Sequence, residues 1–205
     1  MNILVIAATI EEIMPSLPFL DEREIPSLIT GVGMLATTYA LTKTLQQRKI
    51  DLIVQVGIGG ISAFKDKLGT VYQIVSDEVY EFGAEDQDHF LTIDTLGYAK
   101  SYFLQRMPSF PMPIPCVREI RGITVNKVHG NASSIAQLRS RYDEPIMESM
   151  EGAAAFFVAH EECVPILQFR AASNYIEPRD RDSWQIGLAV KNLNDFLQEL
   201  LNFLR

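Results

Sequence analysis

The sequence predicts an α/β protein: a three-layer α/β/α arrangement around a twisted central sheet that is mixed but mostly parallel. Three observations predict this fold. Short apolar runs rich in β-branched residues alternate with longer segments that carry apolar residues at helical spacing. The short runs are apolar almost throughout, as in strands that helices cover on both faces. The 205 residues contain no repeat and no linker, so residues 1–205 are expected to form a single domain.

The elements follow one another in regular order, apart from the middle of the chain. Apolar, β-rich runs predict strands at 2–7, 27–30, 51–56, 70–80, 122–128, 145–150 and 164–169. Helical spacing predicts helices at 9–20 (interrupted by prolines), 34–49, 132–142, 151–162 and 186–205. Residues 81–118 are less regular, and we expect surface loops there, including the proline-rich 107–115, around one helix at 95–107.

The charge argues against nucleic acid as a partner, and the apolar runs argue against a membrane span and a signal peptide. With 26 acidic and 18 basic residues the net charge is −8, which argues against binding nucleic acid through its phosphates but permits a small anionic ligand. No apolar run approaches the roughly 20 residues of a membrane span. The N-terminal apolar run has no basic segment before it, which is typical of a first strand and not of a signal peptide.

The cysteines and histidines indicate neither a disulfide framework nor a metal site. Cys116 and Cys163 lack the spacing of either, so we expect two thiols in or near the core and a protein of the reducing cytoplasm. No pair of histidines has zinc spacing, and no cofactor is expected.

Polar or glycine-rich segments follow most of the predicted strands. They are TGVG, VGIGG, SDE, VNKVHGN, ESMEG and RAASN. Because ligands in such sheets bind beyond the carboxyl ends of the strands, we expect these segments to share one rim. Two glycine segments, several carboxylates, an arginine and an amide would then meet, which is typical of an enzyme.

Each segment alone is a weak signal. GVGM (31–34) and GIGG (57–60) lack the third glycine of a dinucleotide-binding fingerprint, and tight turns are about as plausible there as ligand contacts. Of Glu11 and Glu12, one is expected to complement the start of a helix and the other to face the rim as a general base.

The later segments are equally ambiguous one by one. Glu151 suits either a helix N-terminus or a pair of ribose hydroxyls, with Met150 as an apolar floor for the sugar. Glu148 lies inside an apolar strand, and a structural role is favoured. His129 is the histidine expected at the rim, whereas His160 lies late in a helix.

Taken in order, Glu12, GVG, GIGG, SDE, MEG and RAASN resemble the purine nucleoside phosphorylase and nucleosidase superfamily, including its methylthioadenosine/S-adenosylhomocysteine nucleosidases. The resemblance runs from MNILVIAATIEE to QFRAASN and is poorest over 81–118. It implies a nucleoside phosphorylase/hydrolase-like fold in which Glu12 activates water and the residue at 174 polarises the purine. The residues that it implies against the substrate are Gly57, Ile58, Gly59, Gly60, Val128, His129, Met150, Glu151, Arg170 and Ser173.

Asn174 departs from the adenine-specific members, which carry an aspartate at this position. Adenine presents an N6 amino donor beside N7, whereas a 6-oxopurine presents the O6 acceptor. An amide can donate to O6 and accept from N7–H, but a carboxylate would face O6 with like-signed lone pairs. Asn174 therefore favours hypoxanthine or guanine over adenine.

Two segments, SNYIEPRDRDSW and TVNKVHGN, resemble the futalosine hydrolases of that superfamily. This resemblance implies hydrolysis of futalosine to hypoxanthine and dehypoxanthinylfutalosine in a pathway to menaquinone, and a substrate with a carboxylate beyond its 5′ carbon. It also implies a homodimer or higher homo-oligomer. Two roles stay open for Arg179 and Arg181: binding that carboxylate, or pairing with the acids beside them, which we favour.

Three alternatives remain. A purine nucleoside phosphorylase would bring an arginine and a serine to phosphate near the second glycine segment, where this chain has Gln55 and Ile58. An adenine-directed methylthioadenosine/S-adenosylhomocysteine nucleosidase conflicts with Asn174. A nucleoside-binding module without turnover would not need Glu12 and Glu151.

Overall fold

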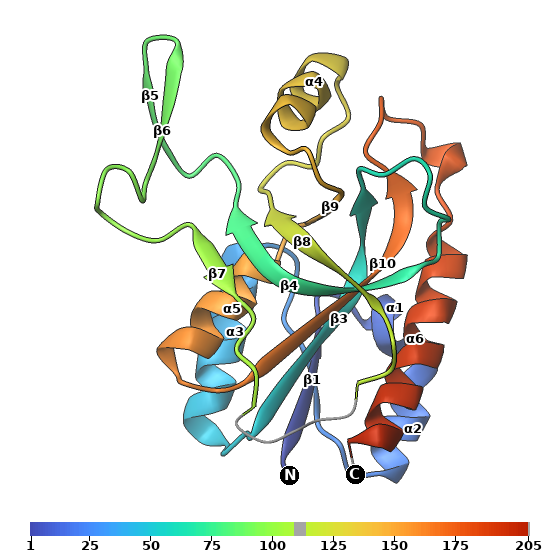
Figure 1. Ribbon diagram of the computed structural model, residues 1–205. Coiled ribbons are helices and arrows are strands. Elements are labelled where there is room, and N and C mark those ends of the chain that lie inside the picture. The colour runs from blue at the N-terminus through green and yellow to red at the C-terminus, as the bar shows by residue number, and fades with distance from the viewer. Residues whose placement is uncertain (109–113, 205) are drawn as a thin grey trace.

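The structure is a computed structural model that describes residues 1–108 and 114–204 (Figure 1). Its strands are β1 (Ile3–Ala7), β2 (Ser27–Ile29), β3 (Leu52–Ile61), β4 (Val71–Val79), β5 (Gly83–Asp86), β6 (His89–Thr92), β7 (Tyr102–Leu104), β8 (Arg118–Thr124), β9 (Ile146–Ser149) and β10 (Ile166–Tyr175). Its helices are α1 (Ile10–Ile13), α2 (Leu17–Glu22), α3 (Met34–Gln47), α4 (Ala132–Arg141), α5 (Gly152–Glu161) and α6 (Ile186–Phe203), with 3-10 turns η1 (Met14–Ser16) and η2 (Arg181–Ser183).

The three-layer α/β/α arrangement is confirmed. Helices α1, α2 and α6 cover one face of the central sheet, and α3 and α5 cover the other (Figure 1). The sheet has eight strands, and most of its pairings are parallel, with β10–β4, β9–β3 and β7–β4 antiparallel. The pairings of β3, β10, β4, β8 and β9 close a ring, while β1 and β2 extend the sheet beyond β3.

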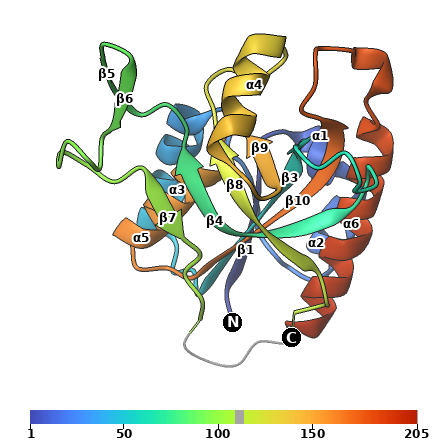
Figure 2. The same ribbon diagram turned by 45° about the horizontal axis from the view of Figure 1, so that its top comes forward.

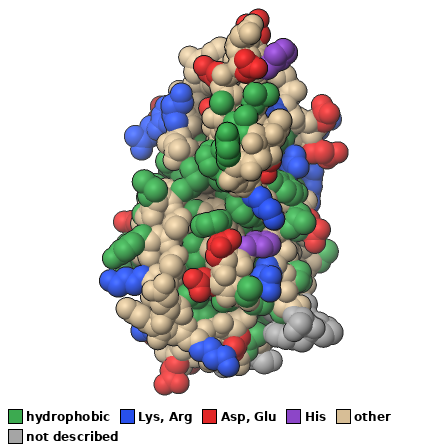
Figure 3. All heavy atoms as spheres, turned by 90° about the vertical axis from the view of Figure 1, so that its left-hand side faces the viewer, with side chains coloured by type: hydrophobic (Ala, Val, Ile, Leu, Met, Phe, Trp, Pro, Cys, Tyr) green, Lys and Arg blue, Asp and Glu red, His purple; other side chains and the backbone are tan. Residues whose placement is uncertain are grey.

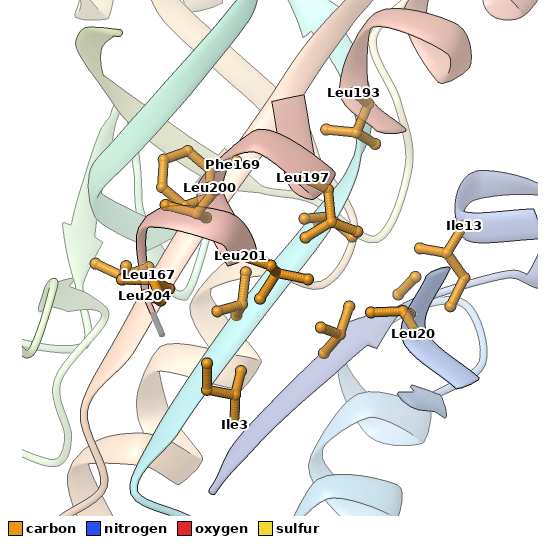
Figure 4. Close-up of a cluster of buried hydrophobic side chains, with 14 of the residues drawn as sticks. Ile3, Ile13, Leu20, Leu167, Phe169, Leu193, Leu197, Leu200, Leu201 and Leu204 are labelled. Atoms are coloured by element: carbon orange, nitrogen blue, oxygen red, sulfur yellow. The ribbon is translucent and has the colours of Figure 1, made fainter. Parts of the chain in front are cut away.

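The core lies on both sides of β3 and β10, which explains why these strands are apolar throughout. On one side the leucines of α6 recur at helical spacing and pack on the sheet, as Leu193, Leu197 and Leu201 do in Figure 4. On the other side Ile53 and Ile166 contact the α3–α5 layer. Both faces are thereby removed from water.

The helix predicted at 95–107 is wrong. Residues 95–98 form a turn in which Gly97 has a φ of +75°, and β7 then pairs with β4. Within β7, Phe103 is buried between two outward-facing neighbours, which is the period of a strand. Before it, β5 and β6 form a hairpin that projects from the body of the molecule (Figure 2), where we expected loops. Of the loop predicted at 107–115, residues 109–113 lie outside the described residues.

Two predicted strands end too early. The strands expected at 51–56 and 164–169 continue to Ile61 and Tyr175, because β3 and β10 run side by side in parallel register over this length. GIGG is therefore part of a strand and not a loop after it, and RAASN lies beside it. The strand predicted at 122–128 begins at Arg118 and ends at Thr124, which leaves Val128 in the following loop.

The cysteines are not in the core, contrary to expectation. Cys116 and Cys163 are both exposed free thiols. Cys163 lies in the turn after α5 with a φ of 55°, and this turn holds its side chain at the surface. Among the described residues, no helix has the length and apolar character needed to cross a bilayer.

Candidate active site

A cavity of about 260 Å³ opens at the carboxyl ends of β1, β3, β9 and β10, where the sequence predicted a shared rim. It brings together the predicted residues Glu12, Ile58, Gly59, Gly60, Val128, His129, Met150, Glu151, Ser173 and Asn174. Gly57 and Arg170 lie just behind its wall. A larger hollow of about 440 Å³ at the opposite end of the sheet contains no predicted site residue.

Glu12 is the carboxylate of its pair that enters the site. Glu11 is exposed, whereas Glu12 is 8% exposed. Oε1 of Glu12 accepts a hydrogen bond from the Ile58 N–H at 2.9 Å, and Oε2 accepts one from the Thr9 N–H at 3.1 Å. Burial raises the pKa of Glu12 above its ordinary value, and the guanidinium of Arg170 partly offsets this rise. A carboxylate of raised pKa suits a general base.

Glu151 precedes α5, but its side chain does not cap that helix. Instead, Oε1 accepts a hydrogen bond from the Gly33 N–H at 3.1 Å, and Oε2 lies 3.4 Å from Nη1 of Arg170. The first contact explains one glycine of GVG, because Gly33 has a φ of +93° that other residues rarely adopt. The carboxylate is thus aimed into the cavity and held from behind.

Arg170 links these two glutamates. Its side chain is 2% exposed, and Nε donates to Oε1 of Gln168 at 3.1 Å. A Cβ on Gly57 would lie 2.3 Å from Nη1 of Arg170 and 2.8 Å from Oε1 of Glu12. Glycine at 57 therefore makes room for the guanidinium between the carboxylates. This role differs from both roles expected for the glycines of GIGG, a tight turn or a ligand contact.

Asn174 follows an irregularity in β10. The parallel register with β3 shifts between Ala172 and Asn174, so that Ser173 is the extra residue and Asn174 lies beside Gly60. The Ser173 hydroxyl donates to Oδ1 of Asn174 at 2.8 Å, and Nδ2 of Asn174 donates to the Tyr175 carbonyl at 3.0 Å. Both contacts fix the orientation of the amide while leaving one N–H and one lone pair for a ligand.

Among the cavity-lining residues that were not predicted as site residues, Glu148 and Trp184 have the side chains best suited to contact a substrate. Glu148, assigned a structural role, reaches the cavity from β9 and is hydrogen-bonded to His129. Trp184 comes from the charged segment after β10, and the guanidinium carbons of Arg179 and Arg181 lie 5.1 and 5.9 Å from its ring centroid. The expected pairing of these arginines with neighbouring acids is wrong, since neither forms an ion pair with any described residue.

The SDE segment does not reach the rim, contrary to expectation. Glu78 is paired with Arg141 outside the cavity. Asp77 is buried behind the site, where it accepts hydrogen bonds from Thr124 at 2.8 Å and Gln168 at 3.1 Å. It therefore supports Arg170 from a distance, through Gln168. In the described part of the chain, no group of three or more His, Cys, Asp or Glu side chains could hold a metal ion.

Gly152→Ala should destabilise the protein. An added Cβ would lie 1.9 Å from Oδ2 of Asp77 and 2.6 Å from Oε1 of Gln168, both buried. Overpacking of this kind costs about 1–3 kcal/mol. Gly187→Ala is the matched control, because Gly187 also lies in the first turn of a helix but in open space. Chemical unfolding measures both, and a Gly152→Ala variant as stable as the control would contradict the expectation.

Asp77 should make stability depend on pH. Burial raises its pKa to about 6 from an ordinary value of 3.8. The folded state therefore holds the proton more tightly, so the contribution of Asp77 is present below pH 4 and lost as pH rises toward 6 and above, by about 3 kcal/mol. As the pH rises from 4 to 7, the unfolding free energy of the native chain should fall by about this amount relative to that of Asp77→Asn. A difference independent of pH would refute the assignment.

The chain resembles solved structures over nearly its whole length, although no protein-family model matches it. The native structure of futalosine hydrolase of Helicobacter pylori strain 26695 has a TM-score of 0.80 at 14% identity, covering 98% of this chain and 97% of that one. The methylthioadenosine/S-adenosylhomocysteine nucleosidase of S. pneumoniae, solved with the transition-state inhibitor MT-ImmA, has a TM-score of 0.81 at 18% identity over 100% of both chains. These similarities establish the fold.

The sequence comparison is more specific. The chain is 34% identical over 164 residues to the futalosine hydrolase of Streptomyces coelicolor, an alignment that covers 76% of this chain and 67% of that protein. The aligned portion is long enough, and the identity high enough, to place the chain in a family: it belongs to the futalosine hydrolases.

Proposed function

We propose that this chain hydrolyses the N-glycosidic bond of futalosine and releases hypoxanthine and dehypoxanthinylfutalosine. The observation that carries the proposal is the lining of a single cavity by a buried Glu12 carboxylate and a fixed Asn174 amide. One group suits activation of water, and the other suits a 6-oxopurine leaving group. Membership of the futalosine hydrolase family supports the substrate.

Glu12 accepts a proton from the attacking water. Its two backbone hydrogen bonds, from Ile58 and Thr9, leave lone pairs on both oxygens for that water. The water oxygen attacks C1′ of the ribose as the bond from C1′ to N9 breaks, and the electron pair of that bond passes to the base. The raised pKa of Glu12 makes the proton transfer more favourable.

Glu151 holds the ribose through its hydroxyls, and Met150 contacts the sugar from the cavity wall. The carboxylate is already fixed by Gly33 and Arg170, so little freedom is lost when the sugar binds. Fixed negative charge near C1′ also stabilises the positive charge that develops on the sugar as the bond breaks.

Asn174 reads the leaving base. Its free N–H donates to O6, so that the charge developing on the purine is hydrogen-bonded as it forms. Once the departing base has taken up a proton from water at N7, the free lone pair of Asn174 accepts from N7–H. Adenine would place its amino group against an amide N–H and leave a buried group unsatisfied. This mismatch weakens the binding of adenine relative to a 6-oxopurine.

The group beyond the 5′ carbon meets the Trp184 side of the cavity. Arg179 and Arg181 stack on this indole and are free of acidic partners among the described residues, in a chain whose net charge is −8. Two guanidinium groups over an aromatic ring suit an aromatic carboxylate, which stacks and forms paired hydrogen bonds. This arrangement supports a substrate with an anionic substituent.

Water is favoured over phosphate as the nucleophile. No Lys or Arg lines the cavity in the part of the chain that the structure describes, and Gln55 is buried within β3 instead of facing it. Arg170, which lies behind the cavity wall, is occupied by Glu151 and Gln168. Hydrolysis therefore requires only groups that the site contains.

The test is incubation of the purified chain with futalosine, inosine and methylthioadenosine, each with and without phosphate, followed by chromatography of the free base. Hypoxanthine should appear from futalosine without phosphate, and far more slowly from inosine. Release that strictly requires phosphate would identify a phosphorylase, and adenine release from methylthioadenosine would identify the other nucleosidase. Binding without any release would indicate a module that lacks turnover.

We also propose a homodimer in the cytoplasm. Hydrophobic side chains gather on the face of Figure 3. Leu104 of β7 and Phe157 of α5 are 57% and 40% exposed. Apolar area of this kind favours self-association. Leu104→Glu should shift the sedimentation coefficient of the chain from dimer to monomer. The free thiols Cys116 and Cys163 are compatible with a reducing compartment.

A further inference from the structure

We propose that Glu148, positioned by His129, is a second specificity-determining residue, which accepts a hydrogen bond from N1–H of a 6-oxopurine. The inference rests on the proposed function and extends it to a second edge of the base. Glu148 is 4% exposed in a strand of otherwise apolar and small residues, yet it lines the cavity. A carboxylate buried to this degree needs hydrogen-bond donors.

The sheet places Glu148 and Asn174 on either side of one glycine. Gly60 in β3 is the cross-strand partner of Glu148 in β9 and also of Asn174 in β10. Cross-strand partners point to the same face of a sheet, so the side chains of Glu148 and Asn174 lie on one face. Gly60 lies between them and has no side chain to fill the space. A Cβ on Gly60 would lie 3.1 Å from Nδ2 of Asn174. Two strand spacings separate the two backbones by about 10 Å, and we place the planar base between the two side chains.

His129 fixes the Glu148 carboxylate. The His129 N–H lies 3.1 and 3.2 Å from the two carboxylate oxygens, and Nδ1 of the ring also bonds Oε2. The ring is held in turn by Tyr80, at 5.2 Å between centroids and 71° between planes. No other described side chain donates to Glu148, so lone pairs remain for a ligand that enters the cavity.

The chemistry of the purine edge matches this pair. N7, O6 and N1 follow one another along the edge of a 6-oxopurine, and N1 carries a proton. Asn174 at O6 and N7 therefore leaves N1–H facing the Gly60–Glu148 side, where a carboxylate accepts it. In adenine N1 is an unprotonated acceptor, and its lone pair would face the carboxylate oxygens. Glu148 thus rejects adenine for a reason independent of Asn174.

The experiment compares binding of free hypoxanthine and free adenine by calorimetry, because binding does not depend on turnover. In the native chain hypoxanthine should bind more tightly than adenine. Glu148→Gln should reduce this preference by about 10-fold or more, since the introduced amide donates to adenine N1 as readily as it accepts from hypoxanthine N1–H. Glu11→Gln, which neutralises an exposed carboxylate outside the cavity, is the matched control and should leave the preference unchanged.

The role of His129 is tested in the same way. His129→Gln keeps Glu148 but removes the ring that holds it, and should lower the preference less than Glu148→Gln does. If Glu148→Gln fails to fold by circular dichroism, Glu148→Asp replaces it, because it withdraws the carboxylate and should still lower the preference. A folded Glu148→Gln or Glu148→Asp variant with the native preference overturns the inference. Failure of the native chain to release hypoxanthine from futalosine would instead overturn the proposed function.

Discussion

Glu12→Gln is expected to lower kcat for hydrolysis of futalosine by about 10²–10⁴-fold, the usual contribution of a general base. The amide keeps the shape of the side chain, but its single oxygen can accept from only one of the Ile58 and Thr9 N–H groups, and it cannot take a proton from water. Substrate affinity should stay within a few-fold of the native value, because the groups assigned to the ribose and the base are untouched.

Stopped assays of hypoxanthine release give kcat, and calorimetry with the inactive variant gives the dissociation constant of futalosine. Glu11→Gln is the control, because it removes the neighbouring carboxylate, which is exposed and does not line the cavity. A Glu12→Gln variant with native kcat would assign the base to another residue. Loss of binding together with kcat would point instead to a structural role for this carboxylate beside Arg170.

The parts of the fold that the sequence predicts are those where one periodicity dominates. The apolar strands around Val54 and Leu167 and the leucine stripe of α6 are examples, because each packs on a large core. The helix expected at 95–107 failed because its apolar residues match either period over a short stretch, and pairing with β4 decided for a strand. Sequence alone does not contain that pairing.

The residues of the site also fall into two groups, those that the sequence predicts and those that it does not. Glu12, Glu151 and Asn174 were predicted because they follow apolar runs whose carboxyl ends meet at one edge, and because their order along the chain resembles that of a known superfamily. Glu148 took its meaning from the register that places it opposite Gly60, and Gly57 from the register that places it beside Arg170. Trp184 and Asp77 depended on how a loop folds back and on what lies beneath the sheet. Such relations exist only in three dimensions.

Asn174→Asp is expected to lower kcat/KM for futalosine by about 100-fold or more, because the site would lose the donor to O6 and gain a repulsive oxygen. The present contacts sharpen this expectation. Nδ2 donates to the Tyr175 carbonyl at 3.0 Å, so an oxygen in its place would face another acceptor at the same distance. The introduced carboxyl group is relieved if it is protonated, and both this carbonyl and the burial of the site should raise its pKa.

A protonated carboxyl group can donate to an unprotonated ring nitrogen, as adenine nucleosides require. Asn174→Asp should therefore gain methylthioadenosine cleavage as the pH falls, while futalosine cleavage stays low throughout. Asn192→Asp is the matched control, because Nδ2 of Asn192 also donates to a carbonyl, that of Gly69 at 2.8 Å, but outside the cavity. If both variants lose stability equally while only Asn174→Asp loses futalosine cleavage, the amide reads the base. Equal kinetics in the two variants would mean that Asn174 stabilises β10 and does not contact the substrate.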